Sequence, residues 1–83
     1  MTQVAKLFAS VLANPRGLTF REFVRLLEAF GFVLDRTVGS HRHYVHPAVP
    51  RSLPVQPSGK DAKPYQVRQF LDMVERYDLD IGA

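Results

Sequence analysis

The chain has 83 residues, so we expect a single domain with a small core. Hydrophobic residues make up 46% and charged residues 23% of the sequence, which excludes a disordered polyelectrolyte. There is no cysteine, so disulfides and thiolate metal sites are excluded and a reducing cytoplasm is permitted. We expect a cytoplasmic protein, because neither a secretory signal nor a membrane span fits the sequence. The formal net charge of +3 favours an anionic partner without identifying it.

The N-terminal segment predicts an amphipathic helix that ends at Asn14-Pro15-Arg16-Gly17. Its apolar residues recur at helical spacing: Val4, Leu7, Phe8, Val11 and Leu12. Lys6 interrupts this stretch, which is too short for a membrane span, so no membrane association is expected. Residues 1–17 are predicted to be a helical extension of a domain over residues 18–83. The apolar side could complete the core or form an interface, either with a second copy as a homodimer or with another protein.

A second helix is predicted from clear start and stop signals. Thr19 and Glu22 have the spacing of a capping box, in which each side chain accepts a hydrogen bond from the other residue's backbone. Gly31 is expected in the left-handed conformation that ends many helices, with Phe32 folding back onto Leu27. The predicted core face consists of Phe23, Val24, Leu27 and Phe30.

Three strands are predicted next, over residues 32–38, 41–46 and 52–56, with a tight turn at Gly39-Ser40. We expect an antiparallel meander with residues 41–46 in the centre. Residues 58–61 are predicted to be a loop.

The last helix is predicted to begin at Pro64, because proline is well tolerated in a first helical turn. Helical spacing continues through Val67, Phe70, Leu71, Val74 and Tyr77. The predicted class is therefore α+β, with helices on one face of a three-stranded antiparallel sheet and the other face partly solvated.

The histidines after the turn are the candidates for chemistry. His41 directly follows Gly39-Ser40, and imidazole is the side chain that most readily exchanges a proton near neutral pH. His43 should share a face with His41 and could act as an acid, or be a partly exposed strand histidine, whereas His46 should point the other way and be a structural or surface residue. Because no cysteine or nearby carboxylate completes a ligand set, we expect no metal site and no cofactor.

Four basic residues lie closest in sequence to the predicted turn and to the start of the last helix: Arg36, Arg42, Lys60 and Lys63. Phosphate contact is predicted for them, because arginine, lysine and helix N-termini all favour phosphate. The alternative is a solvated charged rim. We predict such a solvated role for four arginines at helical surface positions: Arg21, Arg25, Arg68 and Arg76.

Over Leu18 to Leu71, the chain resembles the HicA toxins of bacterial and archaeal toxin–antitoxin systems. The resemblance is carried by four segments in order: Leu26–Phe32, the Gly39-Ser40-His41 turn with Tyr44, the His46-Pro47 pair, and the helix start at Lys63-Pro64. It implies a double-stranded-RNA-binding-domain-like α-β-β-β-α fold, to which this chain adds its N-terminal helix.

The resemblance also implies a function. It assigns the catalytic role to His41 of an endoribonuclease that cleaves mRNA and is neutralised by a HicB-like antitoxin. Ser40 and His43 are expected as accessory groups. Gln56 stands where the family often has a further histidine, and Pro64 where it commonly has glycine. The alternatives are a non-catalytic double-stranded-RNA-binding module and a purely protein-binding domain.

Overall fold

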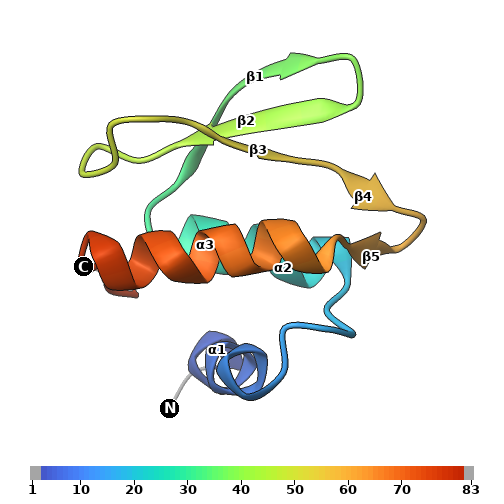
Figure 1. The fold of residues 1–83 in the computed structure, drawn as a ribbon, viewed down its shortest axis with the longest axis vertical. Coiled ribbons are helices and arrows are strands. Elements are labelled where there is room, and N and C mark those ends of the chain that lie inside the picture. Colours follow the sequence, from blue (N-terminus) through green and yellow to red (C-terminus); the bar gives the residue numbers. More distant parts are fainter. Residues whose placement is uncertain (1–2, 82–83) are drawn as a thin grey trace.

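The structure is a computed structural model that describes residues 3–81. Its elements, in chain order, are α1 (Gln3–Ala13), α2 (Phe20–Ala29), β1 (Val33–Val38), β2 (His41–Val45), β3 (Leu53–Val55), β4 (Pro57–Ser58), β5 (Asp61–Ala62) and α3 (Pro64–Arg76) (Figure 1). Strands β1, β2 and β3 form an antiparallel meander with β2 in the centre. The predicted α+β class and the order of helices and strands are confirmed. No helix in the described range is long and apolar enough to cross a membrane.

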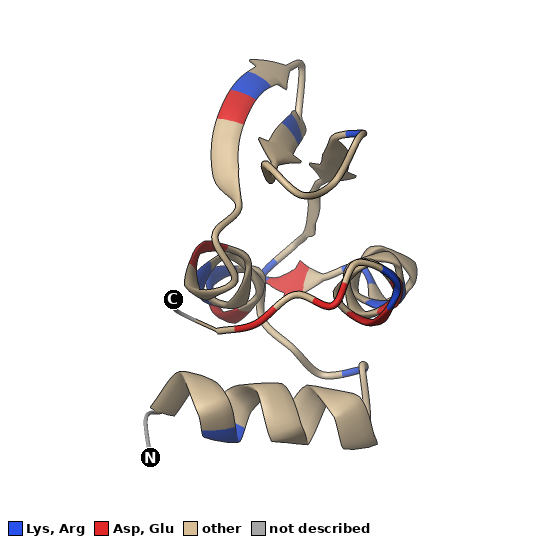
Figure 2. Ribbon diagram, turned by 90° about the vertical axis from the view of Figure 1, so that its left-hand side faces the viewer, with Lys and Arg blue, Asp and Glu red and all other residues tan. Residues whose placement is uncertain are grey.

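The elements form layers. Helices α2 and α3 lie side by side beneath the three-stranded sheet, and α1 lies crosswise below them (Figures 1 and 2). The side chains of Tyr44, Leu53 and Val55 are buried on the helix side of the sheet. The prediction that the helices cover one face of the sheet is therefore confirmed.

Both ends of α2 follow the sequence signals. The Glu22 backbone N–H donates to Thr19 Oγ at 3.1 Å, and the Thr19 N–H donates to Glu22 Oε1 at 2.9 Å. At the other end Gly31 has φ +92°, and the Phe32 N–H donates to the Leu27 carbonyl at 2.9 Å. These bonds satisfy backbone groups that a helix end leaves free, and they set the direction in which the chain leaves for β1.

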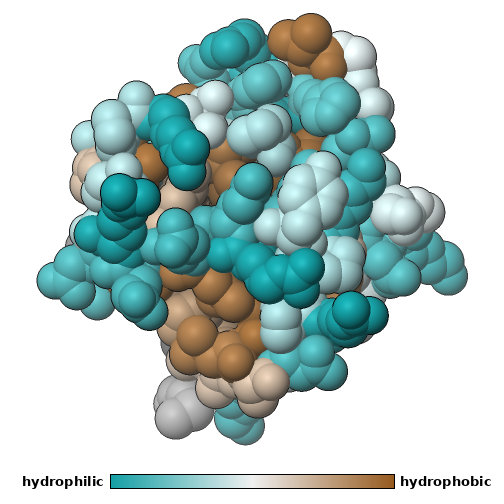
Figure 3. Space-filling view, viewed as in Figure 1, coloured by the Kyte–Doolittle hydropathy of each residue, from teal (hydrophilic) through white to brown (hydrophobic). Residues whose placement is uncertain are grey.

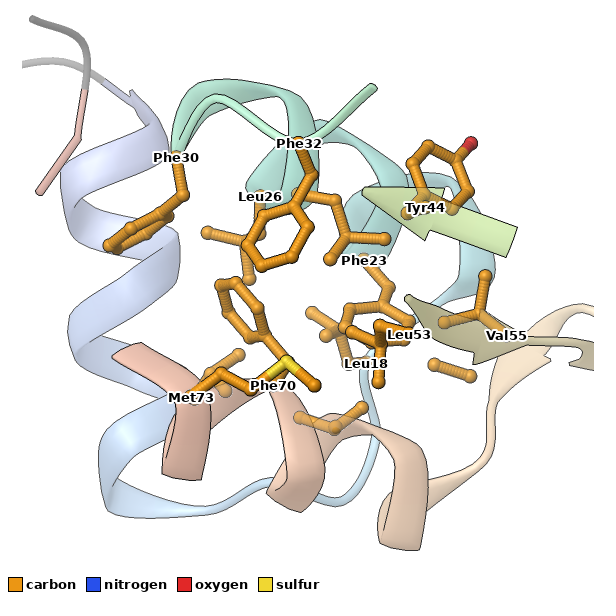
Figure 4. Close-up of a cluster of buried hydrophobic side chains, with 14 of the residues drawn as sticks. Leu18, Phe23, Leu26, Phe30, Phe32, Tyr44, Leu53, Val55, Phe70 and Met73 are labelled. Carbon is orange, nitrogen blue, oxygen red and sulfur yellow. The ribbon is translucent and has the colours of Figure 1, made fainter. Parts of the chain in front are cut away.

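Phenylalanines dominate the core. The ring of Phe70 on α3 lies within contact distance of three others, with centroid separations of 5.8 Å to Phe23, 5.2 Å to Phe30 and 6.0 Å to Phe32 (Figure 4). The tilts of 71°, 84° and 66° are the edge-to-face geometry that aromatic pairs favour. Phe70 thus joins α3 to α2 and to the start of β1.

The predicted N-terminal extension packs on this core. Val11 is buried, and the ring of Phe8 lies 4.8 Å from that of Phe30. The apolar side of α1 therefore completes the core, which leaves Leu12 as its large exposed apolar residue. Apolar surface over α1 and its boundary with α3 is visible at the bottom of Figure 3. Homodimerisation through α1 stays a prediction.

The structure corrects one prediction about the connections. Residues 58–61 form a tight hairpin and not an open loop, because Ser58 ends β4, Asp61 begins β5, and residues 59 and 60 make the turn of this second, two-stranded sheet. Gly59 has φ +64°, which permits the tight turn between them. This small sheet is tied to the start of α2, because the Phe20 N–H donates to the Lys60 carbonyl at 2.8 Å and the Ala62 N–H to the Leu18 carbonyl at 2.9 Å.

Candidate active site

The β1–β2 hairpin turns through two residues, Gly39 and Ser40. Val38 and His41 are cross-strand partners on either side of the turn. Gly39 has φ +61° and Ser40 has no positive φ, which fits a type II′ turn with glycine in its first central position. The backbone conformation at Gly39 therefore fixes where β2 begins and the position from which the His41 side chain projects.

His41 lies at the exposed tip of this hairpin, and its side chain has no hydrogen-bond partner within residues 3–81. Side chains alternate along β2, and cross-strand partners share a face. His41, its partner Val38, His43 and its partner Arg36 thus lie on the sheet face away from the helices, here called the outer face. The predicted placement of His41 and His43 on one face is confirmed by this register.

His43 is more constrained than His41. Its side chain is half-buried, and its Nδ1 lies 3.4 Å from the hydroxyl oxygen of Ser52. Two residues along a strand place the Cα atoms of His41 and His43 about 6.6 Å apart. Ser52 is nine residues from His43 and approaches it because β2 pairs with β3, so no local sequence signal indicated it.

His46 has a structural role, as predicted. Its Nδ1 accepts a hydrogen bond from the Ala48 N–H at 3.0 Å, and its ring packs 5.1 Å from that of Phe32. A Cβ atom on Gly31 would lie 3.2 Å from His46 Nε2, so the helix end and this ring fit closely together. No group of three or more His, Asp or Glu side chains in residues 3–81 is placed to hold a metal ion.

The four basic residues predicted to contact RNA fall into different places. Arg36 lies on the outer face opposite His43, and its guanidinium pairs with the Asp35 carboxylate at 2.8 Å. This exposed pair contributes little to stability, so Arg36 is available to a stronger anionic partner. Lys63 is the N-cap residue of α3, is half-buried and makes no side-chain capping bond.

Arg42 and Lys60 lie on the other side of the sheet. The Arg42 guanidinium carbon is 5.0 Å from the centre of the Phe20 ring, a cation–π contact at the start of α2. Lys60 occupies the exposed turn between β4 and β5. The tip of the β1–β2 hairpin and this turn lie on the same side of the molecule (Figure 1).

Tyr44, next to His43 on β2, faces the helices and not the outer face. Its ring is buried in the core, while its hydroxyl points away from the other side chains labelled in Figure 4. Burial raises the pKa of Tyr44 above its ordinary value, and the Glu28 charge raises it further, although the nearby Arg42 guanidinium acts in the opposite direction. Tyr44 is therefore a core residue, on the face of β2 opposite to that of His43.

A comparison with protein families places this hairpin in a known context. The family model described as HicA toxin of bacterial toxin-antitoxin matches residues 20–74, from the start of α2 into α3. The chain belongs to the HicA toxin family. The matched HicA region contains the whole three-stranded sheet and His41, and it leaves α1 outside. Among curated proteins and among solved structures, no match to the chain was found.

Proposed function

We propose that this HicA protein is an endoribonuclease that cleaves mRNA in the cytoplasm, with His41 as the catalytic residue. The observation that carries the proposal is the presentation of His41 at an exposed hairpin tip, with a side chain that has no hydrogen-bond partner in residues 3–81. A side chain that serves only the fold would be expected to pack or to bond, as His46 does. The family-model match over the same segment supports this role.

The proposed chemistry is a transesterification, in which the 2′-hydroxyl attacks the neighbouring phosphodiester. Neutral His41 accepts the 2′-hydroxyl proton while the 2′-oxygen bonds to phosphorus and the bond from phosphorus to the 5′-oxygen breaks. The leaving 5′-oxygen takes up a proton from a water molecule, and His41 returns its proton to solvent, so the products are a 2′,3′-cyclic phosphate and a 5′-hydroxyl. General base catalysis of this kind contributes about 10²- to 10⁴-fold in rate.

His43 and Ser40 are the proposed accessory groups. His43 shares the outer face with His41, so one phosphate can lie between the two imidazoles. Its contact with Ser52 orients the ring, because one nitrogen faces the Ser52 hydroxyl and the other remains for a ligand. Ser40 is exposed in the turn directly before His41, where its hydroxyl can contact the same phosphate.

Incubation of the purified protein with a labelled RNA, followed by detection of fragments, tests this function. We expect fragments with 5′-hydroxyl ends, and a loss of at least about 100-fold in cleavage rate for His41→Ala. A substrate with 2′-deoxy sugars should bind and stay intact, because it lacks the nucleophile. Equal cleavage by His41→Ala would refute the assignment, and RNA binding without any fragments would instead favour a non-catalytic RNA-binding module.

The outer face also offers a surface for the antitoxin. Val33 and Val38 on β1 are 59% and 58% exposed, and both lie on the same face as His41. A HicB-like partner that buries these valines would cover His41 and so block cleavage. Co-purification with the product of an adjacent antitoxin reading frame, if there is one, should be lost for Val38→Glu. Retention by Val38→Glu would place the antitoxin elsewhere.

A further inference from the structure

An open hollow of about 770 Å³ lies where α2 begins, on the helix side of the sheet. Arg21 and Arg25 of α2 line it from one side, and Lys60 from the β4–β5 turn lines it from the other. A smaller hollow of about 290 Å³ shares Phe20, Arg21 and Arg25 with the first and extends to Arg42. The two hollows are therefore neighbours on the surface, with these three residues lining both. We call the surface formed by Arg21, Arg25, Arg42 and Lys60 the basic groove.

The charge of the basic groove is unbalanced. Four cations line it, and one carboxylate, that of Glu22, accompanies them. Glu22 already accepts hydrogen bonds from the Thr19 N–H and hydroxyl. Within residues 3–81, the ion pair between Arg36 and Asp35 is the one found, so the four cations of the groove have no carboxylate partner there. Such an arrangement attracts an extended polyanion more than a single small anion.

The groove does not depend on free backbone groups at the start of α2. The Phe20 N–H already donates to the Lys60 carbonyl, and the Glu22 N–H to Thr19 Oγ. A ligand in the groove would therefore bind to side chains, and the backbone that carries these side chains is held in place. Phe20 is central, because its ring lies under the Arg42 guanidinium and its backbone holds Lys60.

Arg21 and Arg25 are spaced four residues apart on a helix, which places them on the same side of α2. Together with Arg42 and Lys60 they form a path that runs from the β4–β5 turn to the residue next to His41. A nucleic acid along this path would contact side-chain cations. Such contacts neutralise phosphates and do not recognise the base sequence. Our interpretation of Arg21 and Arg25 from sequence, as simple solvated surface, did not include this path.

We propose that the basic groove binds the sugar–phosphate backbone of the RNA on one side of the cleavage site. This inference rests on the proposed function, because it takes His41 as the residue at which the RNA is cut. His41 and Arg42 are successive residues, so their side chains leave β2 on opposite faces. A strand that lies in the groove reaches His41 by bending around the hairpin tip. A flexible single strand can do so and a stiff duplex cannot, so single-stranded RNA is the preferred ligand.

The test measures RNA binding in the full chain carrying His41→Ala, so that cleavage does not interfere. The probe is a labelled single-stranded RNA of about 20 nucleotides, compared with a duplex of the same length. The test variant adds Arg21→Gln and Arg25→Gln. Its matched control adds Arg68→Gln and Arg76→Gln, which remove the same charge from exposed positions on α3. Urea unfolding at equal midpoints confirms that both variants are folded.

We expect the test variant to bind the single strand about ten-fold more weakly at low salt, and the control to stay within two-fold of the parent. The slope of log K against log salt should fall by about 1.4, or roughly 0.7 for each lost phosphate contact. With His41 restored, the same two substitutions should raise KM and leave kcat at saturating RNA unchanged.

The inference would be overturned by test-variant binding within two-fold of the parent, or by an equal loss in the control. It would also be overturned if Arg21→Gln with Arg25→Gln weakened antitoxin binding alone, since the groove would then be a protein interface. These outcomes are separate from failure of the proposed function, which appears as undiminished cleavage by His41→Ala. Tighter binding of the duplex than of the single strand would refute the bent path.

Discussion

Replacing Gly39 by alanine tests whether the hairpin turn positions His41. Gly39 has φ +61°, and a Cβ added there would meet no atom within 4 Å. The cost is therefore one of backbone conformation alone, about 1–2 kcal/mol for a residue other than glycine in this region. For 83 residues we expect a free energy of unfolding of roughly 4–12 kcal/mol. The variant should stay more than about nine-tenths folded at 25 °C even at the lower limit.

The expected effect on activity is larger than the effect on stability. A shift of about 1 Å in a catalytic group can cost about 100-fold in rate, so we expect a 10- to 100-fold loss of RNA cleavage for Gly39→Ala. Thermal unfolding should show a fall of about 5–15 °C in Tm. The cleavage rate and Tm of Gly39→Asn should lie between those of the parent and of Gly39→Ala, since asparagine tolerates positive φ better than alanine.

Gly17→Ala is the matched control. Gly17 also has a positive φ, +82°, and equally open surroundings, but it lies in the linker between α1 and α2. It should lose similar stability and keep full cleavage activity. If Gly39→Ala cleaved RNA at the parent rate, the turn would not position His41. If it lost no stability, the assignment of strain to this backbone conformation would be wrong.

Three further predictions concern the core and the chain end. Phe70→Ala should lower the free energy of unfolding by about 3–5 kcal/mol in urea titration, because it leaves a cavity among three other phenylalanine rings; a loss below about 1 kcal/mol would contradict this packing. Asp78 has φ +53° just after α3, so Asp78→Gly should increase the free energy of unfolding by about 0.5–1 kcal/mol and thereby raise Tm. An unchanged or lower Tm would contradict this prediction. The raised pKa of Tyr44 means that tyrosine in the unfolded chain ionises first, so stability should fall as pH rises above about 10. Tyr44→Phe should reduce this alkaline loss, and an unchanged pH profile would show that Tyr44 does not cause it.

Local signals in the sequence determined the elements near the site. The capping box of Thr19 and Glu22, the glycine at position 31 and the strand around the Gly39-Ser40 turn all act over a few residues. Such features depend on backbone geometry and nearest neighbours, so they can be recognised before any tertiary contact is known. The alternation along β2 likewise predicted that His41 and His43 share a face.

The tertiary structure decided what comes together across the chain. The contact of Ser52 with His43, the Arg42 guanidinium over Phe20, and the β4–β5 hairpin held against α2 depend on pairings between distant segments. The apolar side of α1 could have faced a partner, and its packing on Phe30 followed from the space left beneath α2 and α3.

The hairpin with His41 was therefore predictable from the sequence, because a two-residue turn and a period of two fix it locally. The basic groove was not, because it is assembled from a helix, a strand and a distant turn whose spacing no local pattern records.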